Sequence, residues 1–181
     1  NDGNGDILQA VQSLNMAGER VSLINLCWAG QASLRYAARA KTAIPLFKPD
    51  VLMYRPFTQN DGNPTAATIA TQKYRMIDVF DTARTNGCYR AVLQSASPVA
   101  ASYGWSGAED DLRKAANVWM ASKSNANSVV YNSGLAALGN GASPERFSVG
   151  MTTDDNHPDD DGYSAVLPST LAALKKVTPA L

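Results

Sequence analysis

A single histidine beside a cluster of acidic residues is the most reactive feature of the sequence. His157 is the only histidine in the 181 residues, and it lies in the run GMTTDDNHPDDDGY, Gly150 to Tyr163. Asp154 stands three positions before it. In a turn, this spacing lets the carboxylate accept a hydrogen bond from one imidazole nitrogen, which leaves the other nitrogen as a base with a fixed tautomer. The pattern predicts His157 as a general base that is oriented by Asp154.

Two other interpretations of the same run stay open. His157 can be a surface histidine in an acidic turn that precedes a helix. It can also join Asp154, Asp155 and the acidic run 159–161 as ligands of a divalent cation, although a His-Pro pair at a helix start is not a ligand signature. The run 159–161 is explained most simply as negative charge at a helix N-terminus. The sequence lacks a C-x-x-C pair, so a structural zinc site is not expected.

Two further residues could supply hydrogen-bond donors to a reacting group. Gly30 can present an unshielded backbone N–H, and Asn60 can present a side-chain amide. Two such donors form an oxyanion hole for the tetrahedral intermediate of acyl transfer. The alternative is that both residues have only a structural role. Gly30 would then occupy a turn that needs a positive φ, and Asn60, in the run NDGNP, would be a turn residue.

The elements that must position these residues alternate along the chain. Amphipathic spacing predicts helices over 7–18, 31–47 (with a late break at Pro45), 63–87, 107–125 and 162–177, whereas short β-rich runs predict strands over 20–28, 50–57, 89–97 and 127–133. Such alternation is typical of a parallel sheet covered by helices on both faces, a three-layer α/β/α sandwich. Because this architecture carries its chemistry at the carboxyl ends of the strands, we expect Gly30, Asn60 and His157 to gather there.

Composition favours one globular domain over residues 1–181, with residues 1–6 resembling a linker. Sixteen basic and sixteen acidic residues cancel, so a nucleic-acid or anionic-membrane partner is not expected. No run is long and apolar enough to span a membrane, and the first residues lack the pattern of a signal peptide. Low charge and abundant Asn, Ser, Thr and Ala favour an extracellular protein. Cys27 and Cys88 are expected to be buried free thiols.

The motifs resemble those of the SGNH hydrolases, the GDSL-type esterases and lipases. TQND, Thr58 to Asp61, is similar to the family's G-x-N-D block, and DDNHP, Asp154 to Pro158, is similar to its D-x-x-H-P block. Gly30, in NLCWAGQAS, stands where the family has its second-block glycine. The resemblance implies an SGNH-type fold and hydrolysis of a small acyl ester, such as an acetyl ester on a carbohydrate, without a metal or organic cofactor. It assigns His157 and Asp154 to catalysis, and Gly30 and Asn60 to the oxyanion hole.

The family's first block, the G-D-S that carries the nucleophilic serine at the end of the first strand, has no match. NGDIL, Asn4 to Leu8, has Ile7 in the place of the serine. We therefore expect the first strand and its serine to come from an upstream segment or a separate chain. Ser33, Ser95 and Ser97 lack the sharp elbow of an activated serine. The alternative function is a non-catalytic carbohydrate-binding module. Aromatic residues predicted in rim loops could stack on a sugar or acyl group: Trp28, Tyr103 and Trp105.

Overall fold

The structure is a computed structural model, and it describes residues 5–27, 30–125, 128–154 and 157–178. The helices are α1 Asp6–Met16, α2 Ser33–Phe47, α3 Ala66–Thr85, α4 Gly107–Ala121 and α5 Asp160–Val177. The strands are β1 Val51–Tyr54, β2 Arg90–Gln94 and β3 Val129–Asn132. Three short 3-10 turns lie in the connecting loops: η1 Gln59–Asp61, η2 Ala101–Tyr103 and η3 Ala136–Leu138. No helix in the described ranges is both long and apolar enough to cross a membrane.

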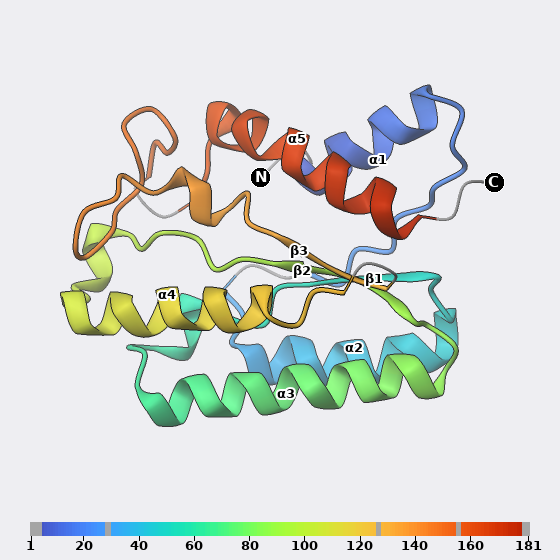
Figure 1. Cartoon of the computed structure of the whole chain (residues 1–181), viewed down its shortest axis with the longest axis horizontal. Coiled ribbons are helices and arrows are strands. Elements are labelled where there is room, and N and C mark those ends of the chain that lie inside the picture. The colour runs from blue at the N-terminus through green and yellow to red at the C-terminus, as the bar shows by residue number, and fades with distance from the viewer. Residues whose placement is uncertain (1–4, 28–29, 126–127, 155–156, 179–181) are drawn as a thin grey trace.

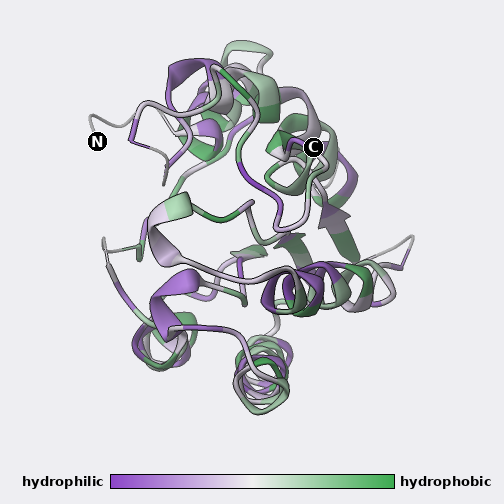
Figure 2. Ribbon diagram, turned by 90° about the vertical axis from the view of Figure 1, so that its left-hand side faces the viewer, coloured by the Kyte–Doolittle hydropathy of each residue, from purple (hydrophilic) through white to green (hydrophobic). Residues whose placement is uncertain are grey.

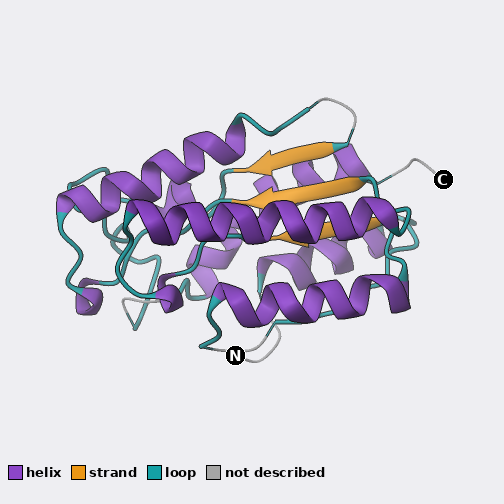
Figure 3. Cartoon of the chain, turned by 90° about the horizontal axis from the view of Figure 1, so that it is seen from below, coloured by secondary structure: helices purple, strands orange, loops and turns teal. Residues whose placement is uncertain are grey.

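The three strands form one parallel sheet in the order β1-β2-β3 (Figure 3). Leu52 of β1 pairs with Ala91 of β2, and Val92 of β2 pairs with Val130 of β3. The central strand β2 is buried on both faces, as expected of a strand that helices cover from both sides. Its carboxyl end and those of its neighbours meet at one edge, shown at the left of Figure 1 and facing the viewer in Figure 2.

Helices cover both faces of this sheet, which confirms the predicted three-layer architecture (Figure 1). α1 and α5 pack together on one face, and α2, α3 and α4 lie on the other. The alternating side chains of β2 divide the core between the two faces, because consecutive residues of a strand point in opposite directions. Val92 packs with Leu14 of α1 and Val177 of α5, whereas Leu93 packs with Ile44 of α2 and Val79 of α3.

The strand predicted over 20–28 is wrong for residues 20–27, and Trp28 lies outside the described residues. The chain between α1 and α2 descends to the level of the sheet (Figure 1), but residues 20–27 have no strand conformation there. Leu23 is 42% exposed and Ile24 is 48% exposed, although the run is as apolar as a buried strand. A strand needs a neighbouring strand to complete its backbone hydrogen bonds. In the described structure, no strand pairs with residues 20–27.

β1 has the burial of an edge strand. Val51, Leu52 and Met53 are only half-buried, whereas four of the five residues of β2 are fully buried. Among the described residues, β1 pairs on one side only, with β2. The other edge of β1 therefore presents backbone N–H and C=O groups on the side where a further strand would add.

Two smaller expectations also need correction. α2 does not break at Pro45 but continues through it to Phe47, where Lys48 ends the helix in a left-handed conformation with φ of 44°. Both cysteines are free as expected, but only Cys88 is buried, and Cys27 is exposed because the run around it is not in the sheet.

Candidate active site

The Asp154 carboxylate holds both the ring and the backbone of His157. Asp154 Oδ2 lies 2.7 Å from His157 Nδ1, and Asp154 Oδ1 accepts a hydrogen bond from the His157 backbone N–H at 2.7 Å. The carboxylate fixes the tautomer with the proton on Nδ1, so that Nε2 is left to accept a proton. About half of each side chain is exposed, so the pair is accessible to a substrate.

The loop that carries this pair is anchored on both sides of His157. Thr152 and Pro158 form an isolated antiparallel bridge, and the Asp159 N–H donates to the Met151 carbonyl at 3.2 Å. Gly162 packs directly on this bridge, because a Cβ added to it would lie 2.9 Å from Pro158 Cβ and still closer to the Met151 carbonyl oxygen. The loop is therefore pinned to the first turn of α5.

The acidic run after the histidine begins α5, as its position predicts. Asp159 is the N-cap, and its Oδ1 accepts a hydrogen bond from the Gly162 N–H at 3.0 Å. Asp160 and Asp161 lie in the first helical turn, where negative charge is favourable. Across the described ranges, no three side chains of the types that bind metals come together, and Asp155 lies outside those ranges.

The structure brings Asn60 against the loop that contains Gly30. Asn60 lies in η1, and its Nδ2 donates to the carbonyl of Gln31, the residue after Gly30, at 3.3 Å. An amide group has two donor hydrogens, so one is left for another acceptor. Gly30 has a φ of 69°, a conformation that favours glycine. Both residues are exposed.

Arg39 and Asp61 anchor the loop of Gly30 and the loop of Asn60 through hydrogen bonds. The Arg39 guanidinium donates to the Leu26 carbonyl and to Gln31 Oε1, one on each side of Gly30. Asp61 Oδ1 accepts the N–H of Ser33, the first residue of α2, at 2.9 Å. Asp61 Oδ2 also accepts from the Ser33 hydroxyl and from Gln72 Nε2. This anchoring role was not predicted from the sequence, where its only signal is the position of Asp61 directly after Asn60.

The three serines weighed as nucleophiles differ in accessibility. Ser33 is fully buried and engaged by Asp61, and Ser95 is fully buried with its Oγ accepting the Ala136 N–H at 2.9 Å. Ser97 alone of the three faces a cleft, where it is half-buried. In the described structure, His157 forms no hydrogen bond with Ser97 and none with Asn60.

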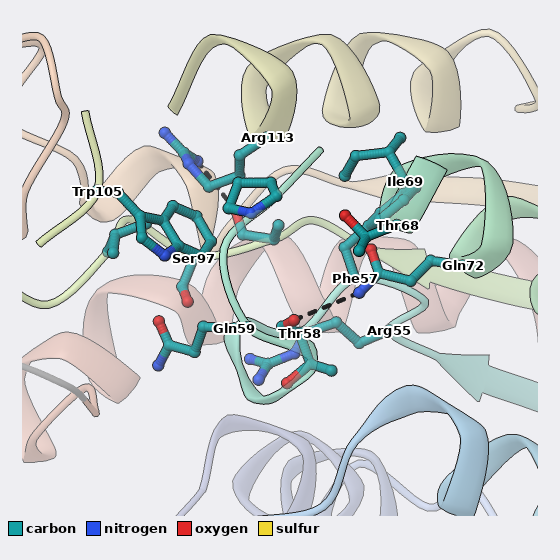
Figure 4. A pocket seen from close by; sticks show the side chains of 14 residues that line it. Arg55, Phe57, Thr58, Gln59, Thr68, Ile69, Gln72, Ser97, Trp105 and Arg113 are labelled. Atoms are coloured by element: carbon teal, nitrogen blue, oxygen red, sulfur yellow. Dashed lines mark hydrogen bonds between the residues drawn. The ribbon is translucent and has the colours of Figure 1, made fainter. Parts of the chain in front are cut away.

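The cleft lies between the loops that follow β1 and β2 (Figure 4). Thr58 and Gln59 line it from the first loop, and Ser97 and Trp105 line it from the second. Tyr103 packs edge-on against Trp105 with ring centroids 6.4 Å apart. Trp105 is only 6% exposed, and its Nε1 has no partner among the described residues. Of the three predicted aromatic contacts, Trp105 lines the cleft, Tyr103 supports it, and Trp28 lies outside the described residues.

A buried ion network supports the second loop. Arg113 donates from Nε to Asp110 Oδ1 at 2.7 Å and from Nη2 to Glu145 Oε2 at 2.5 Å. The Glu145 N–H donates to Asp110 Oδ2 at 2.9 Å, and Arg113 Nη1 reaches the Ala96 carbonyl at 3.3 Å. Burial alone would raise the pKa of Asp110, but these hydrogen bonds together with one from Lys114 hold it below its usual value. The network fixes the backbone beside Ser97.

Comparison with solved structures decides the fold. TesA superposes with a TM-score of 0.74 at 17% identity, over 98% of this chain and 91% of that one. A family 3 carbohydrate esterase from Talaromyces cellulolyticus gives a TM-score of 0.64 at 18% identity, over 95% and 88%. A protein of the G-D-S-L family from Desulfitobacterium hafniense gives 0.70 at 13% identity, over 96% and 90%. The chain has the fold of the SGNH hydrolases.

No family model and no curated protein sequence matches the chain. The SGNH fold was nevertheless expected from the D-x-x-H-P and N-D motifs, and the structure places both motifs on loops at the carboxyl end of the sheet (Figures 1 and 2). α2, α3, α4 and α5 all begin at this end. In an SGNH arrangement this edge is where a strand-borne nucleophile is expected, because the strands of α/β folds carry their chemistry at their carboxyl ends.

Proposed function

We propose that this chain provides the histidine, the aspartate and the oxyanion hole of a serine esterase that hydrolyses a small acyl ester, such as an acetyl ester. The observation that carries the proposal is the 2.7 Å contact between His157 Nδ1 and Asp154 Oδ2 on an accessible loop. This loop lies at the same end of the sheet as the loops of Asn60 and Gly30 (Figure 1). The superposition on an esterase and on a protein of the G-D-S-L family supports the same chemistry.

In this mechanism His157 Nε2 removes the proton of a serine hydroxyl as the serine oxygen attacks the ester carbonyl. Asp154 stabilises the imidazolium that forms. The Gly30 N–H and the free Asn60 amide hydrogen donate to the oxyanion of the tetrahedral intermediate. His157 then returns the proton to the leaving alcohol, and the acyl-serine is hydrolysed by water through the same sequence, with His157 again as base and then acid.

We further propose that the serine comes from a segment outside residues 1–181 that adds as a strand beside β1. Three features support this. β1 is half-buried and pairs on one side only in the described structure. The apolar run 20–27 lies at the level of the sheet with Leu23 and Ile24 exposed. Parallel addition to β1 would carry the end of the new strand to the edge that holds Asn60.

Without that strand, the chain is expected to bind an apolar dye such as ANS, and dye binding that persists in the complete protein would contradict this.

A carbohydrate ester is the proposed substrate, and the extracellular space is the proposed location. One structural neighbour is a carbohydrate esterase, which supports this substrate class. Tyr103, which is half-buried beside the cleft, also supports it, because an aromatic face packs well against the apolar face of a sugar ring, whereas Trp105 is only 6% exposed.

The second candidate is a carbohydrate-binding module that keeps the fold without catalysis. The observation in its favour is that none of the serines within the described ranges is hydrogen-bonded to His157. Hydrolysis of p-nitrophenyl acetate by the chain supplied with a strand ending in Gly-Asp-Ser separates the two. The esterase gains turnover that His157→Ala abolishes and EDTA leaves intact, whereas the binding module shows none. Turnover that EDTA removes would favour a metal-dependent hydrolase instead.

A further inference from the structure

Arg55 is an exposed cation without an ion-pair partner among the described residues, in the cleft beside the proposed oxyanion hole. It follows β1 directly and lines the cleft with Thr58, Gln59 and Ser97. In Figure 4 its guanidinium points toward the side of the cleft where Gln59 and Ser97 lie. The side chain is exposed, and in the described part of the chain it has neither a hydrogen-bond acceptor nor an ion-pair partner.

The remainder of the cleft does not neutralise this charge. Its described lining holds a second arginine and no aspartate or glutamate. Arg113, the second arginine, is compensated from behind by Asp110 and Glu145. Thr58, Thr68 and Ser97 contribute neutral hydroxyls, which can donate hydrogen bonds to an anion. Among the charged side chains that line this space in the described structure, Arg55 is thus the one without an ion-pair partner.

The carboxyl groups in the neighbourhood are engaged by other residues, and one of them, Asp61, accepts hydrogen bonds from Ser33 and Gln72. Asp6, Arg55 and Asp154 all act electrostatically on the hydroxyl of Tyr163, so they surround the same region. Asp154 is engaged by His157. Asp6 is 5% exposed, and its Oδ2 accepts from Thr170 Oγ1 at 2.6 Å and from Gln94 Nε2 at 3.4 Å. Burial raises the pKa of the Asp6 carboxyl and the charge of Arg55 lowers it, so Asp6 lies within electrostatic reach of Arg55, although no hydrogen bond joins the two side chains in the described structure.

We propose that Arg55 selects substrates that carry a carboxylate next to the ester, such as the acyl ester of an acidic sugar. This inference rests on the proposed function and names its substrate class. The planar guanidinium matches a carboxylate in a two-point contact, which a lysine cannot reproduce. In this arrangement the carboxylate is held in the cleft between Arg55 and the Ser97 side, and the ester lies toward Asn60 and Gly30.

The test is a binding measurement, so it does not depend on the serine. The complete protein is titrated with methyl β-D-glucuronoside and with its neutral counterpart methyl β-D-glucoside. The dissociation constants are measured by protein NMR. We expect the glucuronoside to bind about tenfold more tightly, the size of one charge-assisted contact. Arg55→Gln should remove that preference, Arg55→Lys should retain part of it, and high salt should reduce it.

The matched control is Arg84→Gln, which removes an exposed arginine in the last turn of α3, at the opposite end of the sheet. It should leave the preference unchanged. Equal binding of the two glycosides, no binding of either, or a preference that survives Arg55→Gln would each overturn the inference. Circular dichroism confirms that the variants are folded. The proposed function is tested separately by p-nitrophenyl acetate turnover, so an esterase without the preference, or a preference without esterase activity, identifies which of the two ideas is wrong.

Discussion

Asp154 contacts His157 twice, once at the imidazole Nδ1 and once at the backbone N–H, each at 2.7 Å. The two contacts divide between the two carboxylate oxygens, so the ring and the main chain of the histidine are fixed by one side chain. Thr152 Oγ1 also donates to Oδ1 at 3.3 Å. A base held in this way needs little reorganisation when it accepts a proton, even though the pair is half-exposed.

Replacing Asp154 with asparagine tests this orientation. In the serine-containing enzyme, Asp154→Asn should lower kcat on p-nitrophenyl acetate by about 10²- to 10⁴-fold with little change in KM, because the amide favours the wrong tautomer. The matched control is Asp160→Asn, which removes an exposed carboxylate from the first turn of α5. Equal losses of kcat in the two variants would show that the negative charge near His157, and not the specific Asp154 contact, supports catalysis.

Asn60 is predicted to act in the transition state. Asn60→Ala should reduce kcat by about 10²-fold or more while KM stays nearly constant, as expected for the loss of one oxyanion donor. Asn63→Ala is the control, because Asn63 is an exposed asparagine in the same loop. The oxyanion role is excluded if Asn60→Ala raises KM alone, or if both variants behave alike in steady-state kinetics.

Gly162 is predicted to position the catalytic loop without touching the substrate. Gly162→Ala forces a methyl group onto the Met151 carbonyl and Pro158, which should cost about 1–3 kcal/mol of unfolding free energy. It should also lower kcat by at least about tenfold, because His157 shifts with the loop. Ser164→Ala, on the exposed face two residues later, should change neither quantity. Urea denaturation and turnover are the two measurements, and a fully stable, fully active Gly162→Ala would refute the packing argument.

Asp6 is predicted to make stability depend on pH in a definite direction. Its folded-state pKa is raised by burial, so the stability it contributes is complete below the unfolded pKa, near 4, and is lost as the pH rises through the folded value. Asp6→Asn removes the ionisation. Its unfolding free energy relative to the native protein should therefore increase as the pH rises from about 4 toward neutrality. Urea denaturation across that range checks this, and a difference that is independent of pH would contradict it.

Local spacing predicts the contact between Asp154 and His157, which the structure confirms and which joins residues three apart. Asn60 reaches the loop of Gly30 because Asn60 follows β1 and the loop of Gly30 leads into α2. The run 20–28 was predicted as a strand from its apolar residues alone. Residues 20–27 differ because strand formation depends on a neighbour as well as on sequence, and that neighbour is not among the described residues.

Long-range polar contacts were beyond prediction. Arg113 pairs with Glu145 across 32 positions, and Asp61 holds Ser33 across 28. Neither pairing leaves a periodic signal, because each depends on how two loops meet in three dimensions. In the sequence Arg55 is an ordinary charged residue after a strand, and only the composition of the cleft shows that no acidic residue lines it beside Arg55.

Residues 1–181 are proposed to hold the base and the oxyanion donors for a serine that lies elsewhere. To locate that serine, the protein is isolated from the cells that make it and treated with a fluorophosphonate probe, and the modified serine is identified by mass spectrometry. The label should lie outside residues 1–181, and His157→Ala should prevent labelling. Label on Ser97 or another serine of this chain, or ester turnover without any labelled serine, would contradict it.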